Sequence, residues 1–351
     1  MKTTLLSLAI LSSMSLEAGT LEEAFAKSEV SGQVRLGVVQ SKNSTGDKES
    51  TVALGGRLGI KTNPVAGISA AATFYTTNAI LGHSNNGMFL NSENGGYSIV
   101  GEAYLQAELG KTSLKIGRQV VDTPYADSDD IGMIPNTFEG VTLINQDIPD
   151  TTVMLAVLSR WSGVDTEIPE KFNEMQASGE AVYAGGLIYE GIENTTLQAW
   201  QYKLDDTDFN YVEAGYETES YALATQYIDQ GHNNRAFGFS GGVNMGNLAL
   251  NTAYNKAHGT VSNGFGGDPF FTSSEDHTVA EVLDQEAILV GAEYTINDLT
   301  LAVTHVNFYK GENETDYVVS YAVNDKLSFD VIHSDMYGDG KLIRVFANYD
   351  F

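Results

Sequence analysis

The segment VSGQVRLGV, residues 30–38, alternates between apolar and polar positions. Its even-numbered positions hold valine, leucine or glycine, whereas its odd-numbered positions include Ser31, Gln33 and Arg35. Side chains of a β-strand point alternately to its two faces, so this pattern predicts a strand with one apolar and one polar face. Residues 51–61, TVALGGRLGIK, repeat the pattern, with Arg57 and Lys61 on the polar face.

Segments of about ten residues with this alternation recur from residue 28 to the carboxyl terminus. Alternating segments of this length are typical of a transmembrane antiparallel β-barrel, whose outer face meets lipid and whose inner face meets water. The sequence predicts an all-β chain with eighteen strands, or with sixteen if two weak segments are not strands. The predicted strands cover residues 28–39, 51–61, 67–78, 97–109, 112–121, 138–145, 150–161, 179–189, 194–204, 207–218, 220–229, 233–244, 247–258, 284–296, 298–309, 312–323, 325–335 and 340–351.

The lengths of the gaps between these segments also fit a barrel. When an even-stranded barrel has both termini in the periplasm, its long loops lie outside the cell and its short turns lie in the periplasm. All of the longest gaps are odd-numbered in chain order, and this places them on the outer side. These gaps are residues 40–50, 79–96, 122–137, 162–178 and 259–283.

Aromatic residues gather near the ends of the predicted strands, as they do where a membrane barrel meets the headgroup layers. A soluble β-sandwich would also alternate, but it would explain neither this distribution nor the order of the gaps. The residues expected at the outer interface are Trp161, Tyr227, Phe308 and Tyr309. Those expected at the inner interface are Tyr189, Tyr216, Tyr221, Tyr294 and Tyr349.

Composition limits the classes of function. The 46 acidic against 19 basic residues give a net charge of −27, which argues against nucleic-acid binding. The absence of cysteine excludes disulfides, thiolate metal sites and cysteine nucleophiles. The charged, apolar and small residues of Met1–Ala18 predict a secretory signal peptide, followed by a short periplasmic segment at 19–27 and a barrel at 28–351.

Enzyme motifs are not apparent in the sequence. The six histidines are scattered, with no pair at the spacing of metal ligands. His333 and Ser334 raise the alternative of a barrel phospholipase, but no third residue stands where it would orient them. We therefore expect a protein that is not an enzyme and that needs no cofactor.

Several stretches resemble a known family. Residues 21–25 (LEEAF) and 30–35 (VSGQVR) are similar to the mature amino terminus of major outer-membrane porins of epsilonproteobacteria. Residues 114–119 (LKIGRQ) and the following segment to Gly140 resemble the third-loop region of OprD-type porins, and residues 268–273 (DPFFTS) resemble a later loop. The resemblance implies an eighteen-stranded barrel, often trimeric, whose third loop folds into the lumen as a constriction.

That third loop corresponds to residues 122–137 and is acidic. We expect its acids to face basic residues of the barrel wall and to set a transverse field that sorts solutes by charge. The acids are Asp122, Asp127, Asp129 and Asp130, with Glu139 just beyond the loop. The basic candidates are Arg35, Arg57 and Arg344 on adjacent strands, together with Lys115, Arg118 and Arg160.

Two of these assignments carry further detail. Arg118 shares the parity of Leu114 and Ile116, which would turn it toward lipid, so a bulge near Gly117 or a position at the rim is expected instead. Asp127, Asp129 and Asp130 could supply oxygen ligands to Ca²⁺, which is a weak signal in sequence although calcium binding would fit the family.

The leading functional hypothesis is a passive outer-membrane channel of a Gram-negative bacterium for small hydrophilic solutes and ions. The acidic balance predicts a preference for cations, and the expected partners are outer-membrane lipid, lipopolysaccharide and two further copies of the chain in a homotrimer. One alternative is a channel that prefers small anions or amino acids guided by the lumenal arginines. The others are a surface adhesin or structural barrel with a plugged lumen, and a barrel enzyme.

Overall fold

A computed structural model describes residues 20–81 and 88–351. The predicted signal peptide at 1–18 and residues 82–87 of the predicted loop 79–96 lie outside the described residues. The described chain holds one short helix, α1 (Leu21–Ala26), and nineteen strands. The strands are β1 (Glu29–Asn43), β2 (Lys48–Lys61), β3 (Ile68–Leu81), β4 (Tyr97–Leu109), β5 (Thr112–Gln119), β6 (Thr137–Asn145), β7 (Thr151–Ser162), β8 (Asn173–Glu174), β9 (Val182–Ile192), β10 (Thr195–Lys203), β11 (Asp208–Glu217), β12 (Tyr221–Asp229), β13 (Arg235–Met245), β14 (Leu248–His258), β15 (Glu286–Ile296), β16 (Leu299–Phe308), β17 (Glu314–Asn324), β18 (Leu327–Met336) and β19 (Gly340–Asp350).

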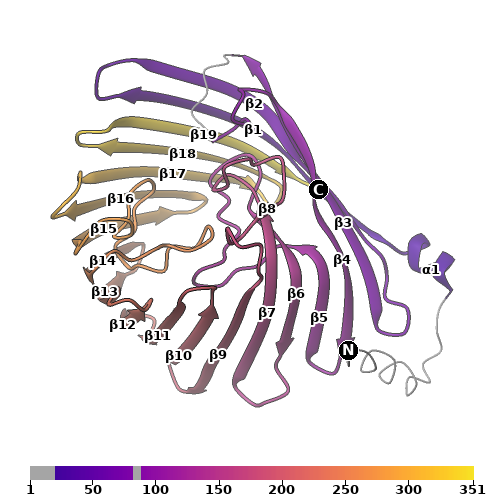
Figure 1. The fold of residues 1–351 in the computed structure, drawn as a ribbon. Helices are drawn as coiled ribbons and strands as arrows, with labels where there is room; N and C mark the ends of the chain where they lie inside the picture. Colours follow the sequence, from indigo (N-terminus) through magenta and orange to yellow (C-terminus); the bar gives the residue numbers. More distant parts are fainter. Residues whose placement is uncertain (1–19, 82–87) are drawn as a thin grey trace.

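The strands close into a single antiparallel barrel (Figure 1). β1 pairs with β2 on one side and with β19 on the other, from Gln33 opposite Asp350 to Asn43 opposite Gly340. The two-residue β8 pairs only with the end of β7, and β7 pairs directly with β9, so the remaining eighteen strands form the ring. The predicted eighteen-stranded antiparallel β-barrel is therefore confirmed.

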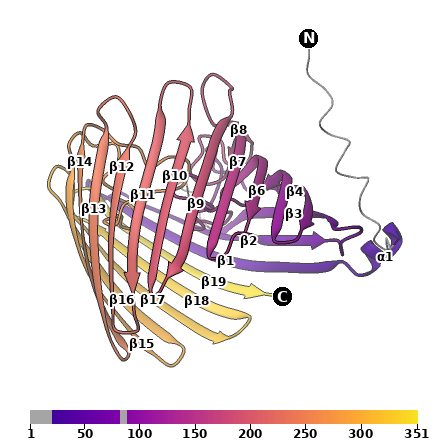
Figure 2. The ribbon, with the colours of Figure 1, turned by 90° about the horizontal axis from the view of Figure 1, so that it is seen from below.

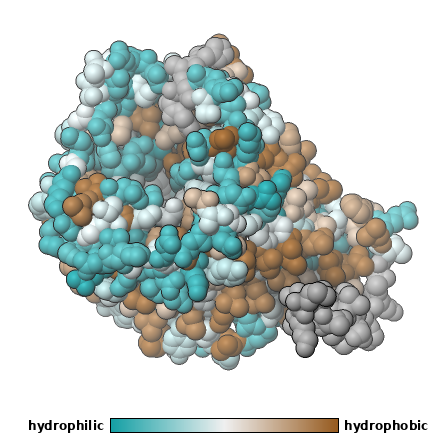
Figure 3. Space-filling view, viewed as in Figure 1, coloured by the Kyte–Doolittle hydropathy of each residue, from teal (hydrophilic) through white to brown (hydrophobic). Residues whose placement is uncertain are grey.

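The outer wall is apolar. In each strand one parity carries exposed Leu, Val, Ile, Phe or Tyr side chains, and the other parity turns inward. Figure 3 shows hydrophobic side chains over the outer wall near β3 and β4 and hydrophilic ones around the opening. No helix within the described residues has the length and hydropathy needed to cross a membrane.

The connections differ at the two ends of the barrel. One end has short turns such as 110–111, 246–247 and 297–298, and the other carries the long loops 120–136 and 259–285. The prediction of a long loop at 40–50 was wrong. The strand pairing continues to Lys42 opposite Lys48 and leaves a turn of four residues, because the polar residues near the strand ends extend the hairpin above the membrane instead of forming a loop.

The prediction of the outer aromatic layer was wrong for two residues. Phe308 is 4% exposed and packs edge-on against His277 of the loop 259–285, so it faces inward. Trp161 stacks on the buried Phe138, because an irregularity in the β6–β7 register shifts the alternation just before it. The inner layer agrees better with expectation, since its predicted side chains Tyr216, Tyr221, Tyr294 and Tyr349 are exposed.

Both ends of the described chain attach to the barrel at the end with short turns. Gly32 and Phe351 exchange backbone hydrogen bonds of 3.0 Å in each direction, so the final residue still pairs with β1. α1 lies beyond the ends of β1 and β2 (Figure 2). A capping box between Thr20 and Glu23 starts this helix, and the Asn63 amide donates to the Ala24 carbonyl and fixes it to the first turn.

The assignment of faces yields a first prediction. Phe239 lies in the middle of β13 with 55% of its surface exposed on the lipid side, whereas the next residue, Ser240, lines an inner cavity of about 850 Å³. Phe239→Arg should lower the free energy of unfolding from lipid vesicles by about 2–4 kcal/mol, because it places a charge in hydrocarbon. Ser240→Arg should change it by less than about 1 kcal/mol, since the inner cavity is wet.

The measurement is reversible urea titration of both variants in vesicles, with Phe239→Ala included to account for loss of the ring. Equal losses for the two arginine variants would contradict the assignment of faces.

Candidate pore constriction

Two long loops enter the barrel and meet inside it. Ala126 of the loop 120–136 forms bridges with Phe265 and Gly266 of the loop 259–285. The Asp127 amide donates to the Phe265 carbonyl at 3.2 Å, and the Phe265 amide donates to the Tyr125 carbonyl at 2.7 Å. Figure 1 shows both loops inside the ring of strands. We name these paired segments, residues 124–127 and 263–267, the crossbar.

Glycine makes this pairing sterically feasible. Gly264 has φ of +89°, and a Cβ placed on it would lie 2.5 Å from the Tyr125 carbonyl oxygen. A Cβ on Gly267 would lie 2.4 Å from the carbonyl oxygen of Pro124. Any larger residue at these positions would force the two loops apart.

Aromatic packing fixes one end of the loop 120–136. The Tyr125 side chain is fully buried, with its ring centroid 5.1 Å from those of both Tyr202 and Phe209 and 6.4 Å from that of Tyr211. These partners belong to β10 and β11. The loop is therefore held against that wall by apolar contact rather than by charge.

An ion pair fixes the opposite end of the same loop. Arg35 of β1 donates to both carboxylate oxygens of Asp130, at 2.6 and 2.8 Å. It also donates to the Gly132 carbonyl at 2.7 Å and to Asn348 Oδ1 at 2.8 Å. A two-pronged arginine–carboxylate contact is strong and directional, so Arg35 and Asp130 hold the loop across the lumen. The structure thus brings together one predicted loop acid and one predicted wall arginine.

Arg344 has different partners from those expected. Its fully buried guanidinium lies 2.9 Å from Glu275 and 3.6 Å from Asp276, which belong to the loop 259–285 and not to 122–137. The sequence interpretation did not include this second loop among the charged elements. The Glu275-Asp276 pair in a segment that resembles a porin loop was a signal that could have identified it.

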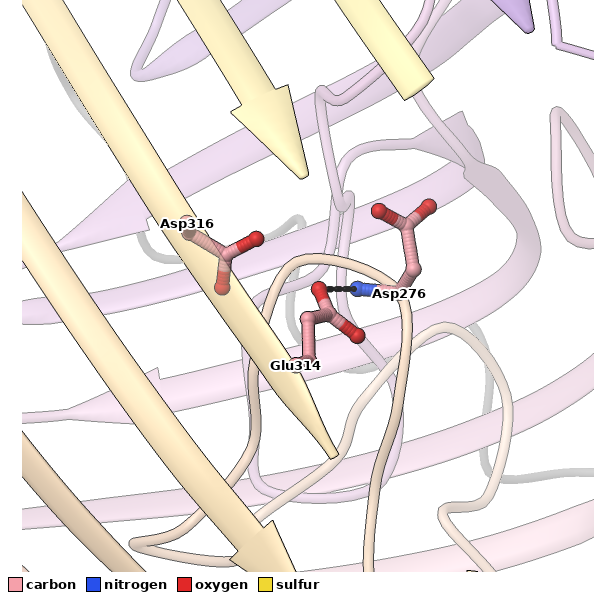
Figure 4. A group of neighbouring side chains, drawn as sticks. All are labelled: Asp276, Glu314 and Asp316. Atoms are coloured by element: carbon pink, nitrogen blue, oxygen red, sulfur yellow. Dashed lines mark hydrogen bonds between the residues drawn. The ribbon is translucent and has the colours of Figure 1, made fainter. Parts of the chain in front are cut away.

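Acids of β17 join the same cluster. Ligand oxygens of Asp276, Glu314 and Asp316 lie within 4.8 Å of one another (Figure 4), and the Asp276 amide donates to Glu314 Oε1 at 3.0 Å. His277 Nδ1 lies 2.6 Å from Glu314 Oε2. Since Arg344 and His277 bring positive charge against these acids, the cluster is an ion-pair network. Glu314 and Asp316 could have been identified from their parity opposite the outward Tyr317.

The loop aspartates proposed for calcium do not converge in this way. Asp130 is engaged by Arg35, and Asp127 Oδ1 accepts a hydrogen bond from the Asp129 amide at 2.9 Å. Asp122 is exposed and accepts from the Ser128 amide at 3.3 Å. In residues 20–81 and 88–351 the acids whose oxygens do converge are those of the Arg344 network instead.

Arg118 and Arg160 share one acid. Glu139 accepts from Arg118 Nε at 3.1 Å and from Arg160 at 2.5 Å. The Arg118 guanidinium also lies 4.2 Å from the ring centre of Phe172, which packs against the inner cluster around Phe89. Gly117 has φ of +130°, but the pairing of β5 with β4 and β6 continues through it without a register shift, so the expected bulge is not formed. Arg118 instead stands one residue before the end of β5, which is the alternative position at the rim.

The remaining basic candidates lie elsewhere on the wall. Lys115 lies over the Tyr104 ring at 4.9 Å from its centre. Arg57 is exposed and lines a small cavity of about 230 Å³ together with Glu102 and Asp350. Neither residue is among those lining the cavity between the two loops.

The serine–histidine pair of the enzyme alternative is not formed. Ser334 is fully buried on β18. The ring of His333 stacks on Tyr317, whose side chain is exposed on the outer wall, and its Nδ1 faces the Leu342 carbonyl. The two side chains therefore point to opposite faces of the strand.

A cavity of about 670 Å³ lies between the crossbar loops and the wall at β16 and β17. The charged groups that line it are almost all acidic. Among the described residues, the lining includes six carboxyl groups and one histidine but no lysine or arginine. The acids are Asp129, Asp165, Asp268, Glu275, Asp276 and Asp316.

Burial changes the titration of the loop acids. It raises the pKa of Asp129 to about 8, with the neighbouring Asp165 and Asp127 adding to the effect and Arg344 opposing it. Burial also raises the pKa of Asp268 to about 6, against hydrogen bonds from Ser273 and Thr278. The cavity consequently becomes more negative as pH rises through the neutral range.

One family model matches the chain, and several solved structures share its fold. A family model described as outer membrane porin, OprD family, matches residues 82–324. The structure is similar to OccK8 (OprE) of Pseudomonas aeruginosa, with a TM-score of 0.79 and 17% identity over 93% of this chain and 98% of that chain. It is similar to OccAB4 of Acinetobacter baumannii, with a TM-score of 0.80 and 16% identity over 92% and 98%. It is also similar to a BenF-like porin of Pseudomonas fluorescens Pf-5, with a TM-score of 0.80 and 14% identity over 93% and 99%. None of the curated proteins matches the sequence.

The crossbar yields a prediction about pore size. Gly264→Ala should separate the loops, because the new methyl group would collide with the Tyr125 carbonyl, and should raise single-channel conductance. Gly46→Ala is the matched control, since Gly46 has φ of +96° but nothing within 4 Å of an added Cβ. Recordings in planar bilayers compare the two variants. An unchanged conductance in a folded Gly264→Ala barrel would show that the crossbar does not limit the pore.

The titration of Asp129 yields a prediction about pH. A carboxyl with a raised pKa is neutral below that pKa and negative above it, so cation preference should increase as pH passes from about 7 to about 9. Reversal potentials in a KCl gradient measure this change. Asp129→Asn should remove most of the increase, whereas Asp206→Asn in an exposed turn should preserve it. A steep increase that survives in Asp129→Asn would assign the titration to another group.

Proposed function

Because this chain belongs to the OprD family of outer-membrane porins and is therefore an outer-membrane channel for small solutes, we propose that it favours cations over anions. The observation that carries the proposal is the cavity between the two inward loops, which six carboxyl groups and no lysine or arginine line among the described residues. A permeating ion that passes this cavity lies close to fixed negative charge in a region of reduced dielectric.

The arginines of the wall do not offset this charge. Arg35 is occupied by Asp130, and Arg344 is buried against Glu275 and Asp276. Arg118 and Arg160 lie against Glu139. Each of these guanidinium groups is compensated by a carboxylate within a few ångströms, so its field beyond that distance is weak. The same pairing cancels the charge of Glu275 and Asp276. The cavity acids that set the sign of the potential are therefore Asp165, Asp268 and Asp316, together with Asp129 once it has lost its proton.

Transport through this pore is passive, and the crossbar limits solute size. The crossbar lies between the acid-lined cavity and a second cavity of about 520 Å³ next to β10 and β11, and we assign the main path of solutes to the acid-lined one. We assign the constriction to both loops together, 120–136 and 259–285, in place of the third loop alone. No cofactor takes part in the proposed function.

The remaining features of the chain are proposed from sequence and resemblance. Residues 1–18 are removed as a signal peptide on export, and residues 19–27 remain in the periplasm with α1 against the first turn. The outer loops face lipopolysaccharide, and three copies assemble as a trimer through their apolar outer walls.

A second candidate is a channel that prefers small anions or amino acids. The exposed Arg57 in its separate cavity favours it, because this guanidinium faces Glu102 and Asp350 in a space that can admit a solute. Arg57→Gln distinguishes the two candidates. It should abolish saturable uptake of an anionic solute if Arg57 binds substrate, and it should alter ion selectivity only slightly if the acid-lined cavity governs permeation.

The main proposal predicts the sign of the reversal potential. In a KCl gradient the open channel should show cation selectivity. At about pH 9 the variant Asp129→Asn/Asp165→Asn/Asp268→Asn should reduce the ratio of potassium to chloride permeability by at least about threefold, because it removes carboxylates from the cavity. The matched control is Asp205→Asn/Asp206→Asn/Asp298→Asn, which removes the same formal charge from turns and should leave the ratio nearly unchanged.

Two results would contradict the proposal. An anion-selective native channel would assign control to the arginines. Equal effects of the two triple variants would assign the preference to overall charge rather than to the cavity. A folded barrel without conductance steps would support the adhesin or structural alternative.

A further inference from the structure

The loop 259–285 touches the wall at its outer edge through a histidine. His277 Nδ1 lies 2.6 Å from Glu314 Oε2 at the start of β17, and His277 Nε2 lies 3.2 Å from Asp339 Oδ2 in the turn between β18 and β19. The two carboxylates come from different elements of the barrel. One imidazole therefore joins the inward loop to two separate parts of the wall.

Only the charged imidazole suits both contacts. Nε2 donates to Asp339, whereas Nδ1 lies close to Glu314 Oε2 as an ion pair outside hydrogen-bond geometry. A neutral imidazole has one N–H and one bare nitrogen, and the bare nitrogen would face a carboxylate with lone pair against lone pair. The imidazolium ion donates from both nitrogens. Glu314 is fully buried and depends strongly on this partner, whereas the Asp339 side chain is 63% exposed and can turn to water.

The other groups near His277 complete its surroundings. From β16 the Phe308 ring packs edge-on, 6.1 Å away, and carries no charge. β17 contributes Asp316 beside Glu314, and β19 contributes Arg344 through its ion pair with the adjacent Asp276. Within its own loop, the His277 amide and carbonyl bond to Ser274. Carboxylates therefore dominate the field at the ring.

We propose that His277 is a pH-dependent clamp that holds the loop 259–285 against the barrel wall. With a proton on both nitrogens, the ring binds Glu314 and Asp339 and keeps the loop in place. When one proton leaves, the remaining N–H stays on buried Glu314 and the contact with the turn at Asp339 is lost. The outer edge of the loop is then free to move.

The clamp acts on the constriction because the loop 259–285 contains both His277 and half of the crossbar. Glu275 and Asp276 precede His277 directly and line the acid-lined cavity, and residues 263–267 of the same loop form half of the crossbar. Motion that begins at His277 therefore reaches the narrow part of the pore. The inference requires an open channel but does not depend on the sign of its selectivity.

The direction of titration follows from the partners. The interaction with Glu314 raises the pKa of His277, with a further contribution from Asp339, while burial opposes both. A histidine with a raised pKa is charged at every pH below the ordinary pKa of histidine. It loses this charge only as the pH rises through its own, higher pKa. The clamp should thus be closed in acid solution and released as the pH rises above the raised pKa of His277.

Single-channel recording tests the clamp through the frequency of brief current interruptions. In the native channel this frequency should increase at least about fivefold between about pH 6 and about pH 9. His277→Gln should show the high frequency at both values. Asp339→Ala, which removes the acceptor at an exposed position and leaves Glu314 paired, should already show it at the lower one.

Two controls separate this effect from other titrations. His305→Gln replaces a histidine outside the clamp and should retain the native response. Asp129→Asn should lose its pH-dependent selectivity but keep the pH-dependent interruptions. A response in His277→Gln or Asp339→Ala that equals the native one, or a native channel without any response, would overturn the proposal. Because Asp339 is exposed, its variant keeps the test decisive if His277→Gln fails to fold.

Discussion

A strand in hydrocarbon has no water to bond, so each of its backbone amides and carbonyls needs a partner within the protein. The pairing of β1 with β19 meets this requirement by closing the sheet on itself. Once the ring is closed, the parity of every residue is fixed with respect to lipid and lumen. The exposed phenylalanine at 239 and the buried arginines at 35 and 344 are consequences of this closure.

Closure also leaves a wide lumen inside the barrel. A ring of this many strands is too wide for wall side chains to fill, so the lumen must be narrowed by inserted chain. Here two loops narrow the lumen together, and backbone pairing in the crossbar holds them to each other. Tyr125 anchors this pairing to β10 and β11, while Arg35 and Arg344 anchor the loops to the opposite wall. Apolar contact and ion pairs thus act at opposite ends of one inserted layer.

The sequence predicted the ring well because alternation is a local property that each strand displays separately. All eighteen strands were placed within a few residues, although β1 and β2 extend well past their predicted outer ends. Phe308 was misplaced even though its parity, opposite to that of the exposed Leu301 and Val303, indicates an inward face. Trp161 was misplaced because its face depends on a register irregularity, which a pattern of period two does not contain. Arg35 could be expected to meet a loop acid, but its choice of Asp130, and the choice of Glu275 by Arg344, depend on how the loops lie.

Because the ion pairs depend on how the loops lie, net charge alone does not determine the ion selectivity of the pore. The arginines that face the lumen are numerous enough to favour anions if their charges were open to the path. Loop acids occupy Arg35 and Arg344 at contact distance, and Glu139 occupies Arg118 and Arg160. Each ion pair that fastens an element therefore also removes a positive charge from the permeation path. The acids beyond those pairs are the groups that a solute meets, so mechanical anchoring and charge selection arise from one set of contacts.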